Sequence, residues 1–313
     1  MIKTLFCTSA ADNFAPGCAV MVYSLRKHLK NFEDHTLKIF YSNLSEESKN
    51  MIRHAAGNIE LIFEKPDLEY CKGASTIYGN NNRDVYLCLE SFNQPEYDTV
   101  MCFDSDMLCI SDFDYHMPYE IGTDFAAVYT RQVGYDGIES RTCIDRTLAQ
   151  PVPNPQRHEK VNAGFWIASR SWVNGSIYRK MIREVVRDTH RIEGADQETV
   201  NRLLRRMRDK GQVRFLLLPS GYNFKNWGGA PVDASKGIGK GGEKVFQECL
   251  PYIKIIHYTG RRKPWADHIA SGERSDSCSI VGLEEMKNST PGKLWHQYYE
   301  ECFGEKCTQS IMV

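Results

Sequence analysis

Short apolar segments alternate with helix-like segments through the first hundred residues, and this alternation constrains the fold more than any other feature. β-branched and aromatic residues mark the segments that are typical of buried strands: 3–8, 36–42, 59–64 and 99–104. Helical periodicity marks the segments between them: 16–30, 45–56 and 83–92. Since strands separated by helices pair in parallel through right-handed crossovers, the pattern predicts an α/β domain with a mostly parallel central sheet flanked by helices.

The second half of the chain is less regular. The expected strands there are 160–169, 213–219 and 252–260, and the expected helices are 172–188 and 195–210. The glycine-rich segment 221–242 contains "GIGKGG", but this run neither follows a strand directly nor opens a clear helix, which excludes a dinucleotide-binding fingerprint. We interpret the segment as a surface loop, with a lid over substrate as the alternative. Residues 292–303 predict a small C-terminal helix that packs on its own domain, with a partner or a membrane surface as alternatives.

Composition indicates a soluble globular protein of 313 residues, with 42% hydrophobic and 25% charged residues. The net charge of −1 supplies no general field for nucleic acid, so no nucleic-acid partner is expected. No segment resembles a secretory signal or a membrane span, and we expect a cytoplasmic protein. Eleven scattered cysteines without a C-x-x-C pair favour reduced thiols over disulfides or a zinc site. The sequence does not predict the oligomeric state.

Two carboxylates, Asp104 and Asp106, follow the apolar segment that ends at Phe103. Like charges this close resist joint ionisation unless a cation or buried donors hold them. In open α/β sheets, ligands bind beyond the carboxyl ends of the strands, where this pair is expected to lie. Because Asp-x-Asp also occurs by chance in turns, the pair alone does not establish a metal site.

His257 ends the last expected strand and begins the segment "HYTGRRKPW". A lone histidine is usually a packed or surface residue, but Gly260 lets the backbone approach a ligand and Lys263 offers a cation for phosphate. Two carboxylates and one imidazole suit Mn²⁺, with Mg²⁺ as the second choice, better than zinc or copper. The sequence therefore favours a site that holds a divalent cation beside a phosphate-bearing substrate.

Five segments, in this order, resemble the motifs of family 8 glycosyltransferases, the retaining group that includes glycogenin and bacterial lipopolysaccharide galactosyl- and glucosyltransferases. They are "CTSAADNFAPGCAVMVYSL", "FDSDML", "VNAGFWI", "ADQETVN" and "HYTGRRKPW". The resemblance spans residues 3–265. It implies a GT-A type nucleotide-sugar-binding domain over residues 1–265, with residues 266–313 as a C-terminal extension packed on it.

The resemblance also implies an activity and a set of site residues. The activity is metal-dependent retaining transfer of a hexose, glucose or galactose, from a UDP-sugar to a glycan, lipid-linked or protein acceptor. The implied metal ligands are Asp104, Asp106 and His257. The implied uridine site is Ala10, Ala11, Asp12 and Phe14, with Asp12 as the best candidate for contacting uracil.

The same resemblance assigns the rest of the donor site. Asp104 would also contact the ribose, and Ser105 stands with the substrate-binding residues although its position varies in the family. Gly260 and Lys263 would hold the diphosphate. The residues implied around the transferred sugar are Arg83, Asn162, Ala163, Asp196 and Gln197. Asp196 and Gln197 are the candidate catalytic residues that steady the reacting centre, and neither is assigned as a nucleophile.

Several of these residues have ordinary structural interpretations that the sequence leaves open. Phe14 could belong to the core, Arg83 could be a solvated cation, Asn162 a turn residue and Asp196 an N-cap. Ala10 and Ala11 would act through their backbone groups.

Three other functions remain open. A metal-dependent nucleotidyltransferase would also use an Asp pair, but "TSAADNF" lacks the glycine-rich basic loop expected to hold a triphosphate. A second alternative is a non-catalytic nucleotide-sugar-binding module. A third is peripheral membrane or polyanion binding through a basic segment, for which an exposed helix face is the simpler interpretation. That segment consists of Arg202, Arg205, Arg206, Arg208 and Lys210.

Overall fold

A seven-stranded sheet forms the centre of the protein, in the order β10-β8-β9-β6-β1-β2-β3. The computed structural model describes residues 2–72, 75–76, 79–80, 83–129, 160–187, 195–225, 246–247, 249–259, 263–268 and 287–304. The strands of the sheet are β1 (Thr4–Ser9), β2 (Thr36–Phe40), β3 (Glu60–Glu64), β6 (Thr99–Phe103), β8 (Phe125–Tyr129), β9 (Val161–Ser169) and β10 (Phe215–Leu217). Two small sheets pair β7 (Met107–Cys109) with β11 (Ile255–His257), and β4 (Ser75–Thr76) with β5 (Gly79–Asn80).

Most neighbours in the central sheet are parallel, as the sequence predicted. β6, β1, β2 and β3 run parallel to one another, and so do β10 and β8. β9 is antiparallel to both of its neighbours, β6 and β8. This reversal places the first residues of β9 beside the carboxyl end of β6, where Phe103 pairs with Phe165.

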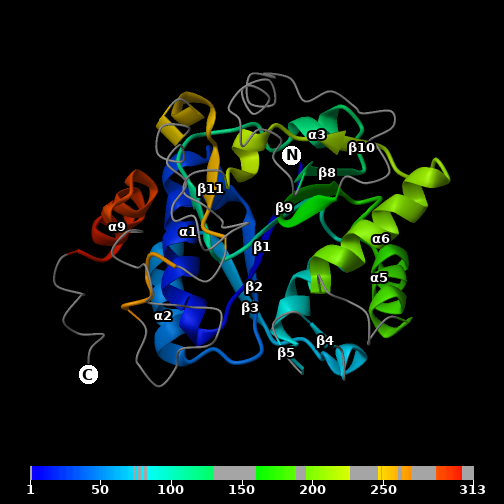
Figure 1. Cartoon of the computed structure of the whole chain (residues 1–313), viewed down its shortest axis with the longest axis horizontal. Helices are drawn as coiled ribbons and strands as arrows, with labels where there is room; N and C mark the ends of the chain where they lie inside the picture. Colours follow the sequence, from blue (N-terminus) through cyan, green and yellow to red (C-terminus); the bar gives the residue numbers. More distant parts are fainter. Residues whose placement is uncertain are drawn as a thin grey trace, which may run out of the picture.

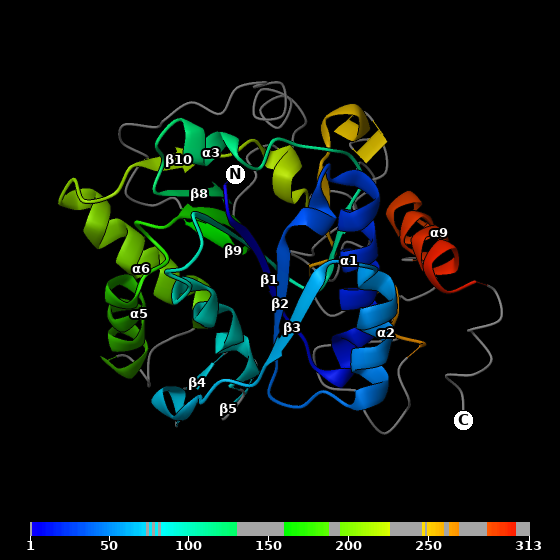
Figure 2. The same cartoon turned by 180° about the vertical axis from the view of Figure 1, so that it is seen from behind.

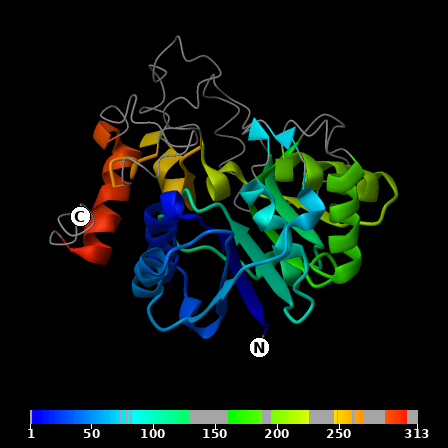
Figure 3. The same ribbon diagram turned by 90° about the horizontal axis from the view of Figure 1, so that it is seen from below.

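Helices cover both faces of the sheet (Figures 1 and 2). α1 (Ala15–His28) and α2 (Glu46–Ala56) lie on one side, and α5 (Gly175–Arg187) and α6 (Ala195–Asp209) lie on the other. α3 (Met117–Glu120) is a single turn, and α9 (Thr290–Phe303) lies outside α1. Figure 3 shows α9 at one end of the molecule and α5 and α6 at the other.

The alternation of side chains along the strands explains this layering. In β1, Leu5 and Cys7 enter the core on the side of α5 and α6, whereas Phe6 enters the core beneath α1 and α2. Successive residues of a strand point to opposite faces, so a strand covered on both faces is apolar throughout. At the start of α2, Ser45 is the N-cap, and its hydroxyl accepts a hydrogen bond from the Ser48 N–H.

The C-terminal helix α9 packs against α1 and the segment that carries Trp265. The indole of Trp295 lies against that of Trp265, with 5.6 Å between ring centroids, and both side chains are fully buried. Lys27 of α1 forms an ion pair with Glu301 of α9 at 2.5 Å. Among the described residues, no helix has both the length and the apolar character needed to cross a bilayer.

Some elements differ from the expectation. The segment expected as a helix over 83–92 is a 3-10 helix, η4 (Asp84–Phe92), whose residues 86–92 are all buried, so its apolar run carries no one-sided helical pattern. β7 and β8 were not predicted. The last expected strand is shortened to β11, which pairs with β7 outside the central sheet. The other 3-10 helices are η1 (Asp12–Phe14), η2 (Phe32–Asp34), η3 (Glu69–Cys71), η5 (Ser220–Asn223) and η7 (Leu250–Tyr252).

Candidate active site

Asp104, Asp106 and His257 meet at the carboxyl end of β6. β11 runs antiparallel to β7, with His257 opposite Met107, and the Tyr258 N–H donates to the Asp106 carbonyl at 2.8 Å. His257 Nε2 consequently lies 3.4 Å from Asp104 Oδ2 and 3.0 Å from Asp106 Oδ1. One ligand atom from each of the three residues lies within 4.8 Å of the others. The structure thus brings together the three side chains predicted as metal ligands.

The surroundings of this cluster fit a divalent cation. Within the described part of the chain, Asp106 Oδ1 is buried and accepts no hydrogen bond of good geometry, although His257 Nε2 lies 3.0 Å away, as expected for two groups that point toward a shared ligand. The backbone of Gly164 leaves the necessary space, because a Cβ there would lie 2.3 Å from Asp104 Oδ2 and 2.7 Å from His257 Cε1. The Asp104 side chain is 41% exposed, so the cluster is open on its side.

The two carboxylates differ in their electrostatic environment. Burial and the nearby charge of Asp106 raise the pKa of Asp104. Burial alone would also raise the pKa of Asp106, but Lys263 and His257 outweigh it and hold that pKa well below its usual range. A cation that binds both carboxylates would relieve the repulsion that raises the pKa of Asp104.

Lys263 is an integral part of the cluster. Its ammonium group is buried, forms an ion pair with Asp106 Oδ2, and donates to the Tyr258 carbonyl at 2.8 Å. It also lies over the ring of Phe14, 5.6 Å from the centroid. The position beside a candidate metal ligand is compatible with the predicted diphosphate contact.

The residues predicted around the sugar come from β9 and α6. Asn162 Nδ2 donates to Gln197 Oε1 at 2.9 Å, and Ala163 is buried beside Asn162 in β9. Asp196 Oδ2 accepts a hydrogen bond from the Cys88 thiol at 3.2 Å. Burial raises the pKa of Asp196 to about 6, although hydrogen bonds from Cys88 and the backbone oppose the shift. The negative charge of Asp196 also contributes to the raised pKa of Asp104.

The segment predicted to hold uridine follows β1 at the same edge of the sheet. The Ala10 N–H extends the pairing with β2 by donating to the Phe40 carbonyl at 3.0 Å, and the Ala11 carbonyl accepts from the Phe14 N–H at 2.8 Å. Asp12 Oδ1 accepts from the backbone and the hydroxyl of Ser45. Burial by itself raises the pKa of Asp12, but hydrogen bonds from Ser48 and Ser45 lower it overall.

Phe14 and Ser105 are placed mainly by packing. Phe14 meets the indole of Trp265 edge-on at 5.9 Å, and Trp265 Nε1 donates to the Asn13 carbonyl at 3.1 Å. Ser105 is buried in the turn between the two carboxylates. The segment from 10 to 14 is therefore tied to the segment that carries Lys263.

Two predicted residues are not brought into the cluster by described contacts. Arg83 forms an ion pair with Glu69 at 3.3 Å. Gly260 lies outside the described residues, as does the part of the expected 221–242 insert from residue 226 onward.

Four further residues belong to the site but were not predicted: Gly164, Asn201, Asn223 and Lys225. Asn201 joins α6 to β9, because its side chain accepts from the Val161 N–H at 2.7 Å and donates to the Val161 carbonyl at 2.8 Å. Asn223 contacts both His257 and Asn162. Burial lowers the pKa of Lys225 to about 8, while Asp104 opposes the shift. Of the four, Gly164 and Asn201 lay within recognised motifs, and Asn223 and Lys225 had no local sequence signal.

Two of the basic residues of α6 form ion pairs with nearby glutamates. Arg202 pairs with Glu198 one turn earlier at 3.2 Å, and Arg206 forms an ion pair with the buried Glu184 of α5. These contacts support the interpretation of this segment as a helix face.

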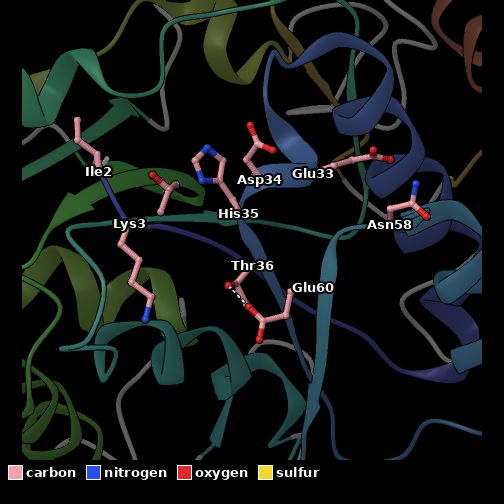
Figure 4. A pocket seen from close by; sticks show the side chains of 9 residues that line it. Ile2, Lys3, Glu33, Asp34, His35, Thr36, Asn58 and Glu60 are labelled. Carbon is pink, nitrogen blue, oxygen red and sulfur yellow. Dashed lines mark hydrogen bonds between the residues drawn. The ribbon is translucent and has the colours of Figure 1, made fainter.

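A separate pocket of about 490 Å³ lies at the opposite edge of the sheet, around the amino ends of β1, β2 and β3 (Figure 4). Its lining includes Lys3, His35, Thr36 and Glu60, and the Thr36 hydroxyl donates to the Glu60 carboxylate at 2.7 Å. Of the predicted site residues that the structure describes, none lines it.

Several solved structures share this fold. The WbbM bifunctional glycosyltransferase in its apo form has a TM-score of 0.58 and 17% identity, with 95% of this chain and 52% of that chain covered. The galactosyltransferase LgtC, in complex with donor and acceptor sugar analogues, has a TM-score of 0.56 and 16% identity, with 95% of each chain covered. The apo glycosyltransferase GlyE of Streptococcus pneumoniae has a TM-score of 0.54 and 16% identity, with all of this chain and 65% of that chain covered.

The likeness to LgtC identifies the fold as GT-A-like. The chain spans about half the length of the WbbM chain and nearly all of LgtC. A comparison with curated protein sequences gave no match. The model of "Glycosyl transferase family 8" matches residues 6–268, which include the candidate metal ligands, the sugar-site residues and Lys263. The chain therefore belongs to glycosyl transferase family 8.

Proposed function

We infer that this protein is a metal-dependent retaining glycosyltransferase that moves a hexose, glucose or galactose, from a UDP-sugar to a hydroxyl of a glycan, lipid-linked or protein acceptor. The observation that carries this proposal is the cluster of Asp104, Asp106 and His257, whose ligand atoms lie within 4.8 Å of one another. Family membership and the fold already support a glycosyltransferase over the nucleotidyltransferase alternative.

Asp104, Asp106 and His257 would hold a divalent cation, with Mn²⁺ preferred because the set combines two hard oxygen ligands with one imidazole. Such an ion supplies charge stabilisation to the diphosphate as it leaves the sugar. The buried Asp106 Oδ1, which faces His257 Nε2, and the space above Gly164 support this assignment.

The protein's own residues supply binding and orientation. Residues 10–14 hold the nucleoside, Lys263 and Gly260 contact the diphosphate, and the sugar lies among Arg83, Asn162, Ala163, Asp196 and Gln197. During transfer the bond from the anomeric carbon to the phosphate oxygen breaks, and a bond to the acceptor oxygen forms on the same face of the sugar. The acceptor proton passes to the departing phosphate oxygen. Lys263 lowers the barrier because negative charge grows on the diphosphate during the reaction.

The electrostatics of the sugar side support a stabilising role for Asp196 and Gln197. Positive charge develops on the anomeric carbon, and a carboxylate or an amide beside it can stabilise that charge. The complex of LgtC with donor and acceptor sugar analogues supports a sugar donor and a sugar acceptor. We further propose a cytoplasmic catalytic domain over residues 1–265 with residues 266–313 as its extension.

A panel of UDP-sugars, including UDP-glucose and UDP-galactose, tests the proposal through slow donor hydrolysis with and without Mn²⁺. We expect Mn²⁺-dependent release of UDP from one hexose donor, and loss of that release in the double variant Asp106→Asn, His257→Ala. Undiminished turnover in this variant would rule out the metal assignment. Mn²⁺-dependent UDP binding without hydrolysis or transfer would instead identify a non-catalytic module, and an inverted product would contradict the retaining mechanism.

A further inference from the structure

Four side chains form a continuous hydrogen-bonded chain from the candidate metal cluster to the candidate sugar site. His257 Nδ1 lies 2.8 Å from Asn223 Oδ1, Asn223 Nδ2 donates to Asn162 Oδ1 at 2.7 Å, and Asn162 Nδ2 donates to Gln197 Oε1 at 2.9 Å. Asn223 is fully buried and His257 nearly so. Buried hydrogen bonds of this kind fix side-chain orientation because their loss leaves unsatisfied polar groups.

The backbone fixes both residues of the first hydrogen bond in this series, Asn223 and His257. Asn223 is the last residue of η5, and the next residue, Phe224, forms a parallel bridge with Ile256. The Phe224 N–H donates to the Ile255 carbonyl at 2.8 Å, and the His257 N–H donates to the Phe224 carbonyl at 2.9 Å. Asn223 and His257 are therefore fixed relative to each other by main-chain bonds, independently of their side chains.

Which groups donate and which accept along this series of hydrogen bonds follows from the chemistry of a metal-binding imidazole. When Nε2 of His257 serves as a ligand, Nδ1 carries the proton and must donate. Asn223 then has to present its carbonyl oxygen to His257, which leaves its N–H groups for Asn162. Asn162 receives this bond at Oδ1, which also accepts from the Gly164 N–H at 3.1 Å, and so turns its own N–H groups toward Gln197.

The last link determines what Gln197 can offer to a ligand. Its carbonyl oxygen accepts from Asn162 and keeps a second lone pair, so the oriented amide can offer that lone pair and its N–H groups to the sugar. The backbone carbonyl of Gln197 accepts from Asn201 Nδ2 at 2.7 Å, which ties the residue to β9. In this arrangement the bond from Asn162 fixes the orientation of the Gln197 amide.

We propose that Asn223 is a positioning residue that sets the tautomer of His257 and, through Asn162, the orientation of the Gln197 amide. The inference rests on the proposed function and deepens it, because one amide chain couples metal binding to donor-sugar contact. Both ends of the Asn223 side-chain amide are needed: the carbonyl oxygen contacts His257, and the N–H donates to Asn162.

Three variants separate the links. Asn223→Leu removes both groups, Asn223→Asp keeps an acceptor for His257 but cannot donate to Asn162, and Asn162→Asp keeps its acceptor but cannot donate to Gln197. The matched control is Gln94→Leu, which removes a buried amide that bonds to Lys38 and Glu90 away from the cluster. Mn²⁺ affinity is measured without substrate by calorimetry, and donor hydrolysis gives kcat and KM for the UDP-hexose.

We expect Asn223→Leu to weaken Mn²⁺ binding by about 10- to 100-fold, as for other residues that orient metal ligands. Asn223→Asp and Asn162→Asp should keep Mn²⁺ affinity at or above the wild-type level, yet lower kcat by about tenfold or more because Gln197 is misoriented. Nitrogen-15 spectra of the Mg²⁺-loaded protein should show His257 protonated at Nδ1 in the wild type and in Asn162→Asp. Gln94→Leu should lower only the melting temperature.

Two results would overturn the inference. One is wild-type Mn²⁺ affinity in a folded Asn223→Leu protein, and the other is wild-type kcat in Asn223→Asp, which also decides the question if Asn223→Leu does not fold. A wild-type protein that binds no Mn²⁺ and hydrolyses no UDP-hexose would overturn the proposed function itself. A wild-type protein that does both, with unchanged variants, would overturn only the role of Asn223.

Discussion

Gly164 faces Asp104 so closely that a Cβ on Gly164 would lie 2.3 Å from Asp104 Oδ2. The main chain brings them together, since the Asp104 N–H donates to the Gly164 carbonyl at 2.7 Å. The atoms that a side chain on Gly164 would meet belong to the functional groups of Asp104, His257 and Asn162. The requirement for glycine here is therefore set by the site and not by backbone conformation.

Gly164→Ala should weaken Mn²⁺ binding by at least about tenfold, because the methyl group displaces two of the three ligands. The fold should survive, since the clashing atoms are side-chain ends that can move. Calorimetric titration with Mn²⁺ and a melting curve measure the two effects. Gly175→Ala is the control, since its Cβ would lie 3.2 Å from the flexible end of Arg179 and 3.8 Å from Asn93 Oδ1, which is ordinary contact. Unchanged Mn²⁺ affinity in Gly164→Ala would show that the cation binds elsewhere.

Lys263→Ala should destabilise the metal-free protein by about 3–5 kcal/mol, because it leaves the buried Asp106 carboxylate without its ion-pair partner. Mn²⁺ supplies the missing positive charge, so it should raise the melting temperature of this variant more than that of the wild type. Lys30→Ala is the control: its partner is Asp112, its side chain is 84% exposed, and its loss should cost less than about 1 kcal/mol. An equal Mn²⁺ effect on variant and wild type would argue against a shared carboxylate.

Asp196→Asn should stabilise the metal-free protein near pH 7.5 while lowering transferase activity. Burial raises the folded-state pKa of Asp196 to about 6 from 3.8, so the unfolded chain loses this proton at a lower pH than the folded one. The stability that the protonated Asp196 side chain contributes to the wild-type protein is fully present below about pH 4 and is lost as pH rises through 6. The neutral amide avoids this loss, and with allowance for partial exposure we expect a gain of about 1–2 kcal/mol. Denaturant unfolding at pH 4 and pH 7.5 measures it, and a variant less stable than wild type at pH 7.5 would contradict the assignment.

Trp265→Ala should cost about 3–5 kcal/mol, because the fully buried indole fills the junction between Phe14, Gly17 and Trp295. It should also weaken UDP binding, since Trp265 Nε1 holds the Asn13 carbonyl in the candidate nucleoside segment. Trp265→Phe keeps most of the packing and loses that bond, at a cost of about 1 kcal/mol in stability. Melting curves and UDP titrations separate the two effects. UDP affinity that is unchanged in Trp265→Ala would disconnect this junction from the nucleoside site.

The local pattern of the sequence was enough to predict the parallel half of the sheet and the position of the Asp pair. Apolar strands and intervening helices encode β1, β2, β3 and β6, and the pair after Phe103 had to emerge at a carboxyl edge. Motif order indicated that His257 and Lys263 belong to the same site, and the structure places both beside Asp106.

The contacts across the site depended on tertiary structure. β9 runs antiparallel to β6, so its first residues, and not its last, lie beside Asp104; strand periodicity carries no information on direction. His257 reaches the carboxylates because β11 pairs with β7, a three-residue strand too short to stand out from its neighbours. Asn201 bonds to Val161, 40 positions away in the sequence. Asn223 bonds to Asn162 and His257, which are 61 and 34 positions away. The sequence by itself determined the chemical groups of this site, whereas long-range strand pairing decided which of them meet, because that pairing sets distances that no local pattern records.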